Sequence, residues 1–335
     1  MQPSVKLTMI GLLAVGLALA VLFAGCTQTQ PAPATPTPAP AGTTTAAATP
    51  TPTPVVHEPN TLLIATTTSL YDTGLLNAVQ DIYQNETGIN LKITEQGTGI
   101  AIQIATRGDC DLLLVHSPSQ EKAFIDKGLG INQRCFAYNY FEVVGPASDP
   151  AGIANLTPEA GFKKILTLGM NNTPDVFFAS RGDNSGTQTA EIGIWTRAGF
   201  NYTTQVSSAG PWYLSLGKGM GDTLVFASQK GAYTLTDEGT FLAYKTKLNL
   251  VPLITNKPTL LNRYSAIAVN PAKNPNVNIV QADRFINWLI SPEGMKVVGD
   301  YGVAQYGKSL FTPLAPGVCN VTPFNCTCSG AVAPI

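Results

Sequence analysis

The sequence carries little charge and almost no histidine. Lys and Arg number 20 against 21 Asp and Glu, charged residues make up 12% of its 335 positions, and only 2 histidines occur. Such a chain lacks the basic surface that captures nucleic acid. With few histidines and no G-x-S-x-G turn, it also offers little for general base or nucleophilic catalysis. We therefore expect a binding protein, not an enzyme, without a cofactor, a metal-ion site or a nucleic-acid partner.

Residues 1–26 have the pattern of an export signal. Lys6 precedes the uninterrupted apolar stretch 10–23, and Ala24-Gly25-Cys26 follows. Small residues before a cysteine are typical of a lipobox, which predicts lipidation of Cys26. An uncleaved signal anchor stays open, because about 17 apolar residues is the lower limit for a membrane span. Both interpretations place the rest of the chain on the extracellular face of the cell membrane.

Residues 27–57 read as a disordered tether. The stretch 27–54 contains only Thr, Gln, Pro, Ala and Gly, with eight prolines and no charge. Such a composition cannot bury enough apolar area to offset the entropy lost on ordering, and its prolines favour extended chain. A tether beside a membrane is consistent with delivery to a membrane partner.

Six cysteines occur in a chain that we expect to be exported. If Cys26 is lipidated, five remain, and disulfides are permitted outside the cell. We expect Cys110 to pair with Cys135, one pair within the trio of the C-terminal tail 319–335, and one free thiol. The trio is Cys319, Cys326 and Cys328. Connectivity is not readable from sequence, so this pairing is the economical choice among several.

From residue 58 onward, strand-like runs alternate with helical patterns. Apolar runs predict strands at 60–66, 90–94, 111–116 and 136–144, with helices between them. This βαβαβ order favours an α/β fold with a mostly parallel sheet covered by helices on both faces. The pattern restarts at residue 158, and a further strand is predicted at 264–270.

This restart predicts two lobes joined by two crossings. We expect lobe 1 to comprise residues 58–145 and 256–318, and lobe 2 to comprise residues 146–255. In such folds a ligand binds between the lobes, where strands end and helices begin.

Loops at the predicted strand ends share one design, in which hydroxyls or glycines open a helix. They are Thr67-Thr68-Ser69, Gly97-Thr98-Gly99, the loop at Ser117, and the segment 181–187. A helix N-terminus leaves backbone N–H groups unpaired, and glycine lets the backbone approach a ligand closely. Such loops can capture an anion. For any single loop, a Ser or Thr acting only as an ordinary helix N-cap is the alternative.

Arg181 adds a full positive charge at these loops. Three helix termini of about half a charge each, together with Arg181, give about +2.5, which matches a dianion. We expect Asp183 to orient Arg181 or to cap the following helix, and a simple local Arg181–Asp183 ion pair is the default alternative.

Three segments resemble a known family. The sequences ATTTS at 65–69, DLLLVHSP at 111–118 and SRGDNSGT at 180–187 are similar to those of the tungstate-binding proteins of Tup-type ABC transporters, a type II periplasmic-binding-protein family. The similarity extends from about residue 60 to 312. It implies a two-lobed monomer that closes around one tungstate, or molybdate more weakly, and delivers it to a membrane permease. The ligand donors that the resemblance implies are Thr68, Ser69, Arg181, Ser185 and Thr187. We add Thr67, Thr98, Ser117 and Gly186 from the same loops.

Two other functions remain as alternatives. One is a phosphate- or sulfate-binding protein on the same fold. A phosphate site needs an acceptor for the proton of its ligand, and Asp183 could fill that role. A surface adhesin would account for the tether and for the tripeptide Arg181-Gly182-Asp183, but it gives no reason for hydroxyl-rich loops at strand ends.

Overall fold

A computed structural model of the chain describes residues 57–255, 257–319, 324, 326–328 and 330–332. The predicted export signal, Cys26 and nearly all of the tether therefore lie outside the described residues. The described residues belong to one compact unit. Among them, no helix is both long enough and apolar enough to cross a membrane.

The first elements alternate as the sequence predicts. Helix α2 shows why: Leu75, Leu76, Val79 and Tyr83 recur at helical spacing and are all buried, and the helix ends at Gly88 with φ +70. The elements are β1 (Thr61–Thr67), α1 (Thr68–Asp72), α2 (Leu75–Thr87), β2 (Asn90–Gln96), α3 (Thr98–Arg107), β3 (Leu112–Val115), α4 (Pro118–Asp126) and β4 (Gly130–Gly145).

The later elements include several that are too short for periodicity to reveal, among them β6, β7 and α8. The elements are α5 (Pro158–Met170), β5 (Phe178–Ser180), α6 (Gly186–Arg197), the π-helix η1 (Tyr202–Val206), β6 (Tyr213–Ser215), α7 (Met220–Lys230), β7 (Thr234–Asp237), α8 (Glu238–Tyr244), the 3-10 helices η2 (Lys245–Lys247) and η3 (Lys257–Thr259), β8 (Val251–Ile254), β9 (Leu261–Val269), α9 (Ile279–Leu289), α10 (Pro292–Asp300), α11 (Val303–Tyr306) and β10 (Thr312–Pro313).

The larger sheet is mixed, where the sequence predicted a mostly parallel one. Its strand order is β10-β4-β9-β3-β1-β2, and β7 and β8 pair with β4 outside that path. Strand β1 pairs in parallel with β2 and β3, whereas β9 is antiparallel to β3 and β4. The physical reason is that β9 returns along β4 after the second crossing, so it enters the sheet in the opposite direction. A separate parallel pair joins β5 and β6.

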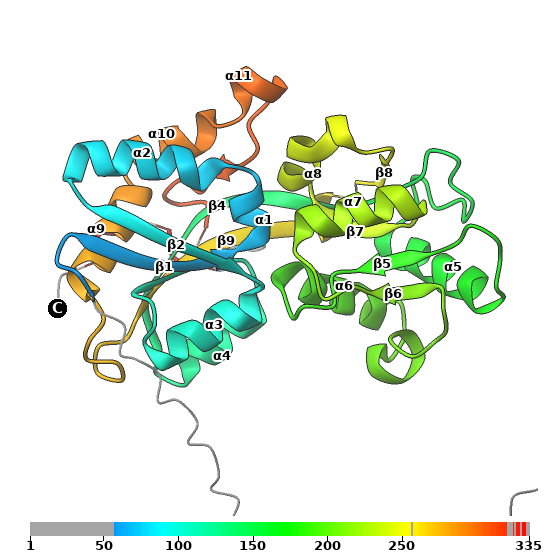
Figure 1. Ribbon diagram of the computed structural model, residues 1–335, viewed down its shortest axis with the longest axis horizontal. Helices are drawn as coiled ribbons and strands as arrows, with labels where there is room; N and C mark the ends of the chain where they lie inside the picture. The colour runs from blue at the N-terminus through cyan, green and yellow to red at the C-terminus, as the bar shows by residue number, and fades with distance from the viewer. Residues whose placement is uncertain (1–56, 256, 320–323, 325, 329, 333–335) are drawn as a thin grey trace, which may run out of the picture. The chain divides into compact units, whose positions relative to one another are not determined.

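Buried side chains gather in two places along β4. The core 1 region packs around Leu62, Tyr83 and Phe285 and comprises β1 to α4, the first part of β4, and β9 to β10. The core 2 region packs around Phe162 and Trp195 and comprises the end of β4 and α5 to β8. Figure 1 shows β4 and β9 running side by side between the two regions.

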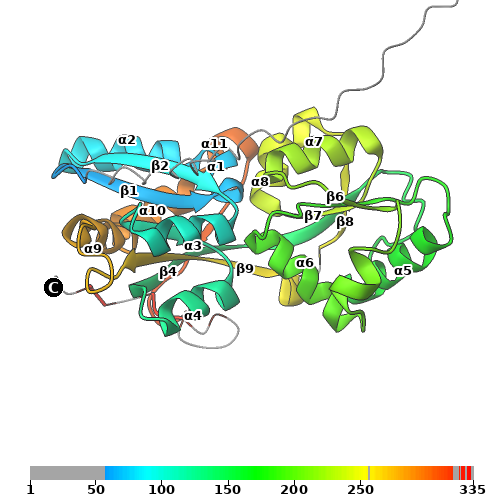
Figure 2. The same cartoon turned by 60° about the horizontal axis from the view of Figure 1, so that its bottom comes forward.

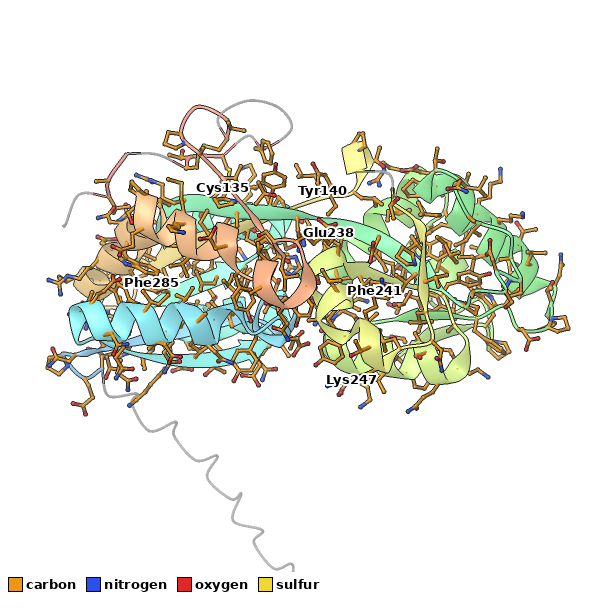
Figure 3. The ribbon with its side chains drawn as sticks, turned by 90° about the horizontal axis from the view of Figure 1, so that it is seen from above. Cys135, Tyr140, Glu238, Phe241, Lys247 and Phe285 are labelled. Atoms are coloured by element: carbon orange, nitrogen blue, oxygen red, sulfur yellow. A yellow bond between two sulfur atoms is a disulfide. The ribbon has the colours of Figure 1, made fainter. Side chains whose placement is uncertain are left out.

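The expected Cys110–Cys135 disulfide is wrong. Cys135 pairs with Cys326, Cys319 pairs with Cys328 within the C-terminal trio, and Cys110 is a buried free thiol. Cys110 precedes β3 and Cys135 lies on β4, with β9 between these strands. Two strand spacings are about 9.6 Å, beyond the reach of a disulfide. In Figure 3, Cys135 lies on β4 beside the C-terminal segment that holds its partner.

Candidate functional site

The candidate site forms where the loops of the two regions meet. Because β1, β2 and β3 are mutually parallel, their carboxyl ends bring the loops at Ser69, Thr98 and Ser117 to one edge of the sheet. The segment 181–187, which follows β5 in the core 2 region, contacts all three of these loops. The structure therefore brings the predicted site residues together.

Arg181 is the main link between the regions, and its side chain is 1% exposed. Its Nη1 donates to Ser69 Oγ at 2.9 Å, and its Nη2 donates to Thr68 Oγ1 at 2.8 Å. Nη2 also donates to Asp183 Oδ2 at 2.5 Å, while Asp183 Oδ1 accepts from Ser185 N at 3.2 Å. Asp183 thus orients the guanidinium and braces the turn that leads into α6.

Glycines let these loops meet backbone to backbone. A Cβ at Gly97 would lie 2.8 Å from Asp183 O, and one at Gly186 would lie 2.7 Å from His116 O. The Gly99 N–H donates to Asn184 O at 3.1 Å. Since real Cβ contacts essentially never fall below 3.0 Å, larger residues at Gly97 and Gly186 would force the loops apart.

The side chains of two predicted donors also cap helices. Thr67 Oγ1 accepts from Leu70 N at 3.3 Å, and Ser185 Oγ accepts from Gln188 N at 3.2 Å. The capping alternative therefore holds for these residues. A hydroxyl that accepts through its oxygen still has its own proton to donate, so capping does not remove either group as a ligand donor.

Other predicted donors are buried without a partner among the residues that the structure describes. A buried hydrogen-bonding group left unpaired costs free energy, so a cluster of such groups indicates a place built for a polar ligand. The atoms at these loops are Thr98 Oγ1, Ser117 Oγ, Thr187 Oγ1 and Arg181 Nε.

A buried carboxyl supports the strand before Arg181. Glu191 accepts from Ser180 Oγ at 2.6 Å, Trp195 Nε1 at 3.0 Å and Tyr213 Oη at 2.7 Å. Burial raises the pKa of Glu191 to about 7, although these hydrogen bonds oppose the shift. Because Ser180 immediately precedes Arg181, the hydrogen bonds of Glu191 hold the backbone from which the Arg181 side chain extends.

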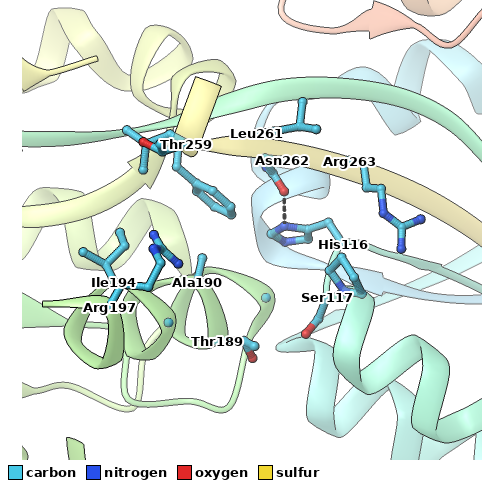
Figure 4. A pocket seen from close by; sticks show the side chains of 15 residues that line it. His116, Ser117, Thr189, Ala190, Ile194, Arg197, Thr259, Leu261, Asn262 and Arg263 are labelled. Carbon is cyan, nitrogen blue, oxygen red and sulfur yellow. Dashed lines mark hydrogen bonds between the residues drawn. The ribbon is translucent and has the colours of Figure 1, made fainter. Parts of the chain in front are cut away.

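Sequence reasoning missed a chain of buried polar side chains on the two crossing strands. Asn262 Nδ2 donates to Asn139 Oδ1 at 2.9 Å, and these residues lie opposite each other on β9 and β4. Asn262 Oδ1 lies 2.8 Å from His116 Nδ1, which must therefore carry the proton (Figure 4). Burial lowers the pKa of His116 to about 4, so the ring is neutral. The available signal was an asparagine inside each apolar strand.

This chain of side chains borders a cavity of about 220 Å³ between the regions. Figure 4 shows Thr189 and Arg197 of α6 on one side of it and His116 and Ser117 on the other. Ser117 and Gly186 belong both to the cavity wall and to the predicted site. The cavity therefore adjoins the predicted site and lies in the same interface between the two regions.

One further motif does not form the site that its spacing suggests. Residues 302–309 read G-x-x-x-x-G-K-S, the spacing of a phosphate-binding loop, which requires a strand before it and a helix after it. Here α11 lies inside the motif, and Lys308 Nζ lies 3.4 Å from Glu238 Oε2. In the part of the chain that the structure describes, no group of three or more His, Cys, Asp or Glu side chains is placed to hold a metal ion.

The chain is similar to several known proteins. A family profile described as the PBP superfamily domain matches residues 34–293. The tungstate-binding protein TupA of Peptoclostridium acidaminophilum is 38% identical, over 76% of this chain and 86% of the relative. The solved structure of TupA from Desulfovibrio alaskensis G20 is 40% identical, with a TM-score of 0.61 over 76% of this chain and 99% of that one. The crystal structure of the tungstate ABC transporter from Geobacter sulfurreducens is 38% identical, with a TM-score of 0.63 over 72% of this chain and 98% of that one.

Proposed function

We propose that this chain, which belongs to the PBP superfamily and within it to the tungstate-binding proteins of ABC transporters, captures tungstate between its two core regions. It acts as a solute-binding protein and not as an enzyme. The observation that carries the proposal is the set of donors buried at the meeting loops without a partner among the described residues, led by Arg181 Nε and Thr98 Oγ1.

The donors suit a fully deprotonated tetrahedral dianion. Such an ion accepts hydrogen bonds in every direction and offers none, and the proposed ligand set is rich in N–H and O–H groups. Charge-assisted hydrogen bonds contribute about 1.5–3 kcal/mol each, so six to eight of them can exceed the cost of association. The donors that we propose are Thr67, Thr68, Ser69, Thr98, Ser117, Arg181, Ser185, Thr187 and the backbone N–H of Gly186.

Phosphate is the second candidate, and the environment of Asp183 argues against it. A protonated phosphate needs an acceptor, and each carboxylate oxygen of Asp183 already accepts one hydrogen bond, from Arg181 or from Ser185, which leaves Asp183 fewer lone pairs for that proton. Tungstate and molybdate carry no proton near neutral pH and make no such demand. We therefore rank these two ions above phosphate, and the similarity to tungstate-binding proteins leads us to rank them above sulfate.

The proposal extends to how the protein works in transport. The core 1 and core 2 regions act as the two lobes, with the crossings on β4 and β9 as the hinge, and closure buries the anion. The closed monomer then delivers it to a membrane permease. Cys26, lipidated or within an uncleaved anchor, holds the tether at the extracellular face of the membrane.

Calorimetric titration of the purified full chain with tungstate, molybdate, sulfate and phosphate tests the ligand. We expect tungstate to bind in a 1:1 ratio, molybdate more weakly, and sulfate and phosphate at least about a hundredfold more weakly, a difference of about 2.7 kcal/mol. Absence of binding by all four ions would refute the proposal, and a preference for phosphate would replace tungstate as the ligand.

A further inference from the structure

Helix α7 begins without a cap from its own region. Its N-cap residue is Gly219, which has no side chain to accept a hydrogen bond. The first N–H groups of any α-helix lack partners within the helix, so they need acceptors from elsewhere. Among the described residues, those acceptors come from the core 1 region.

Two side chains of α1 cap α7 across the interface. Gly221 N donates to Asp72 Oδ2 at 3.0 Å, and Met220 N donates to Thr68 Oγ1 at 3.3 Å. Figures 1 and 2 both show α1 lying against the core 2 region next to α7 and α8. A Cβ at Gly219 would meet Thr68 Cγ2 at 3.2 Å, so the absence of a side chain there lets the two helices approach.

The Asp72 carboxylate is stabilised at the N-terminus of α7, whereas it would be repelled by a bound anion. Negative charge is stabilised at a helix N-terminus, where the peptide dipoles leave a partial positive charge. A carboxylate touching tungstate would instead repel it. Asp72 also ends the short helix that begins with Thr68, and the Thr68 hydroxyl meets the same helix α7.

We propose that Asp72 is a positioning residue that retains the bound anion, because its carboxylate caps α7 from the opposite region and holds the two regions together around the site. This inference rests on the proposed function. Opening the interface would leave both α7 N–H groups and the Asp72 carboxylate to water, so the cap slows opening. The expected effect is therefore on the rate at which anion leaves.

The test compares Asp72→Ala and Asp72→Asn with the control Asp222→Ala. Asp222 lies in the first turn of the same helix, but its side chain is exposed and faces Lys218 of its own region at 3.6 Å. Loss of an N-cap weakens a helix terminus by about two- to thirtyfold. We expect tungstate to leave the Asp72→Ala protein faster by that factor in stopped-flow displacement, with association little changed. Asp72→Asn, which keeps an acceptor oxygen, should lie between Asp72→Ala and wild type.

The control and a second readout separate the outcomes. Asp222→Ala should release tungstate at the wild-type rate; equal rates for Asp72→Ala and Asp222→Ala would overturn the inference. If Asp72→Ala fails to fold, the release rates of Asp72→Asn and wild type are compared instead. Faster release by Asp72→Asn supports the inference, and equal rates would overturn it. Should wild type bind no oxoanion, the proposed function fails and the cap is still tested without ligand. Amide hydrogen exchange at Met220 and Gly221 should then be faster in Asp72→Asn than in wild type, and unchanged exchange would refute the cap.

Discussion

Arg181 Nη1 donates to Ser69 Oγ across the interface of the two core regions, although the residues are 112 positions apart in the chain. The same guanidinium reaches Thr68, while Asp183 holds it in place. One side chain thus joins the loop after β1 to the loop before α6. Several consequences can be measured.

Replacing Arg181 by lysine should abolish tight anion binding. The planar guanidinium serves Thr68, Ser69 and Asp183 at once, whereas a lysine ammonium is a single point on a flexible stem. We expect tungstate affinity, measured by calorimetry, to fall at least about a hundredfold, or 2.7 kcal/mol. Arg107→Lys, at an exposed arginine paired with Asp109, is the control and should bind normally. An Arg181→Lys protein within a few-fold of wild type would contradict the proposed site.

Thr98→Val should weaken binding without harming the fold. Valine has the shape of threonine but no hydroxyl, and Thr98 Oγ1 is a buried group without a partner in the described part of the chain. Losing one charge-assisted bond of about 1.5–3 kcal/mol predicts a loss of affinity of roughly ten- to hundredfold. The melting temperature of the ligand-free chain should stay level or rise.

The matched control is Thr196→Val on the exposed side of α6, where the hydroxyl bonds only to the Ile192 carbonyl. It should leave affinity unchanged. Equal affinities for the two valine variants would mean that Thr98 does not contact the anion.

Gly97→Ala should push the loops of the two regions apart. Its φ of −65° suits alanine, so the backbone is not strained, but the added methyl would lie 2.8 Å from Asp183 O. We expect weaker tungstate binding by tenfold or more, which is about 1.4 kcal/mol, with a normal melting temperature for the ligand-free chain. Gly193→Ala within α6 is the comparison, because its methyl would meet only the mobile end of Arg197 at 3.4 Å. If both variants bind alike, the loops do not need this close approach.

Stability should depend on pH through Glu142 on β4. Burial, and then the charge of Glu238, raise its pKa from 4.5 to about 8. Between these values the folded state holds a proton that the unfolded state has lost, so this group makes the protein less stable as pH rises from about 4.5 to 8. Glu142→Gln removes that dependence. Since one pKa unit corresponds to about 1.4 kcal/mol and the pKa rises from 4.5 to about 8, the variant should gain on the order of 4 kcal/mol at pH 8 and under about 1 kcal/mol at pH 5.

Urea unfolding at both pH values measures this effect. Glu95→Gln, at an exposed residue of β2, is the control and should show no such gain. A Glu142→Gln protein that is less stable than wild type at pH 8 would show that the charged carboxylate stabilises the fold.

The sequence predicted most elements because each depends on nearby residues. Strands β1 and β2 fall within about two residues of their expected positions, since apolar runs determine them locally. Strand β7, four residues long, gave no such pattern, although its Asp237 caps α8. The candidate site was predictable as four loops, because hydroxyls and glycines at strand ends are visible in the sequence.

By itself the sequence determined the succession of strands and helices, the hydroxyl- and glycine-rich loops that we propose as the anion site, and the resemblance to tungstate-binding proteins. The tertiary structure alone decided that β9 enters the sheet antiparallel, that Cys135 pairs with Cys326 and that Asp72 caps α7. Cys135 and Cys326 are 191 positions apart in the sequence, and Asp72 lies 149 positions from its partner Gly221. Local spacing cannot encode such pairings, because they depend on how whole elements pack once the cores have formed.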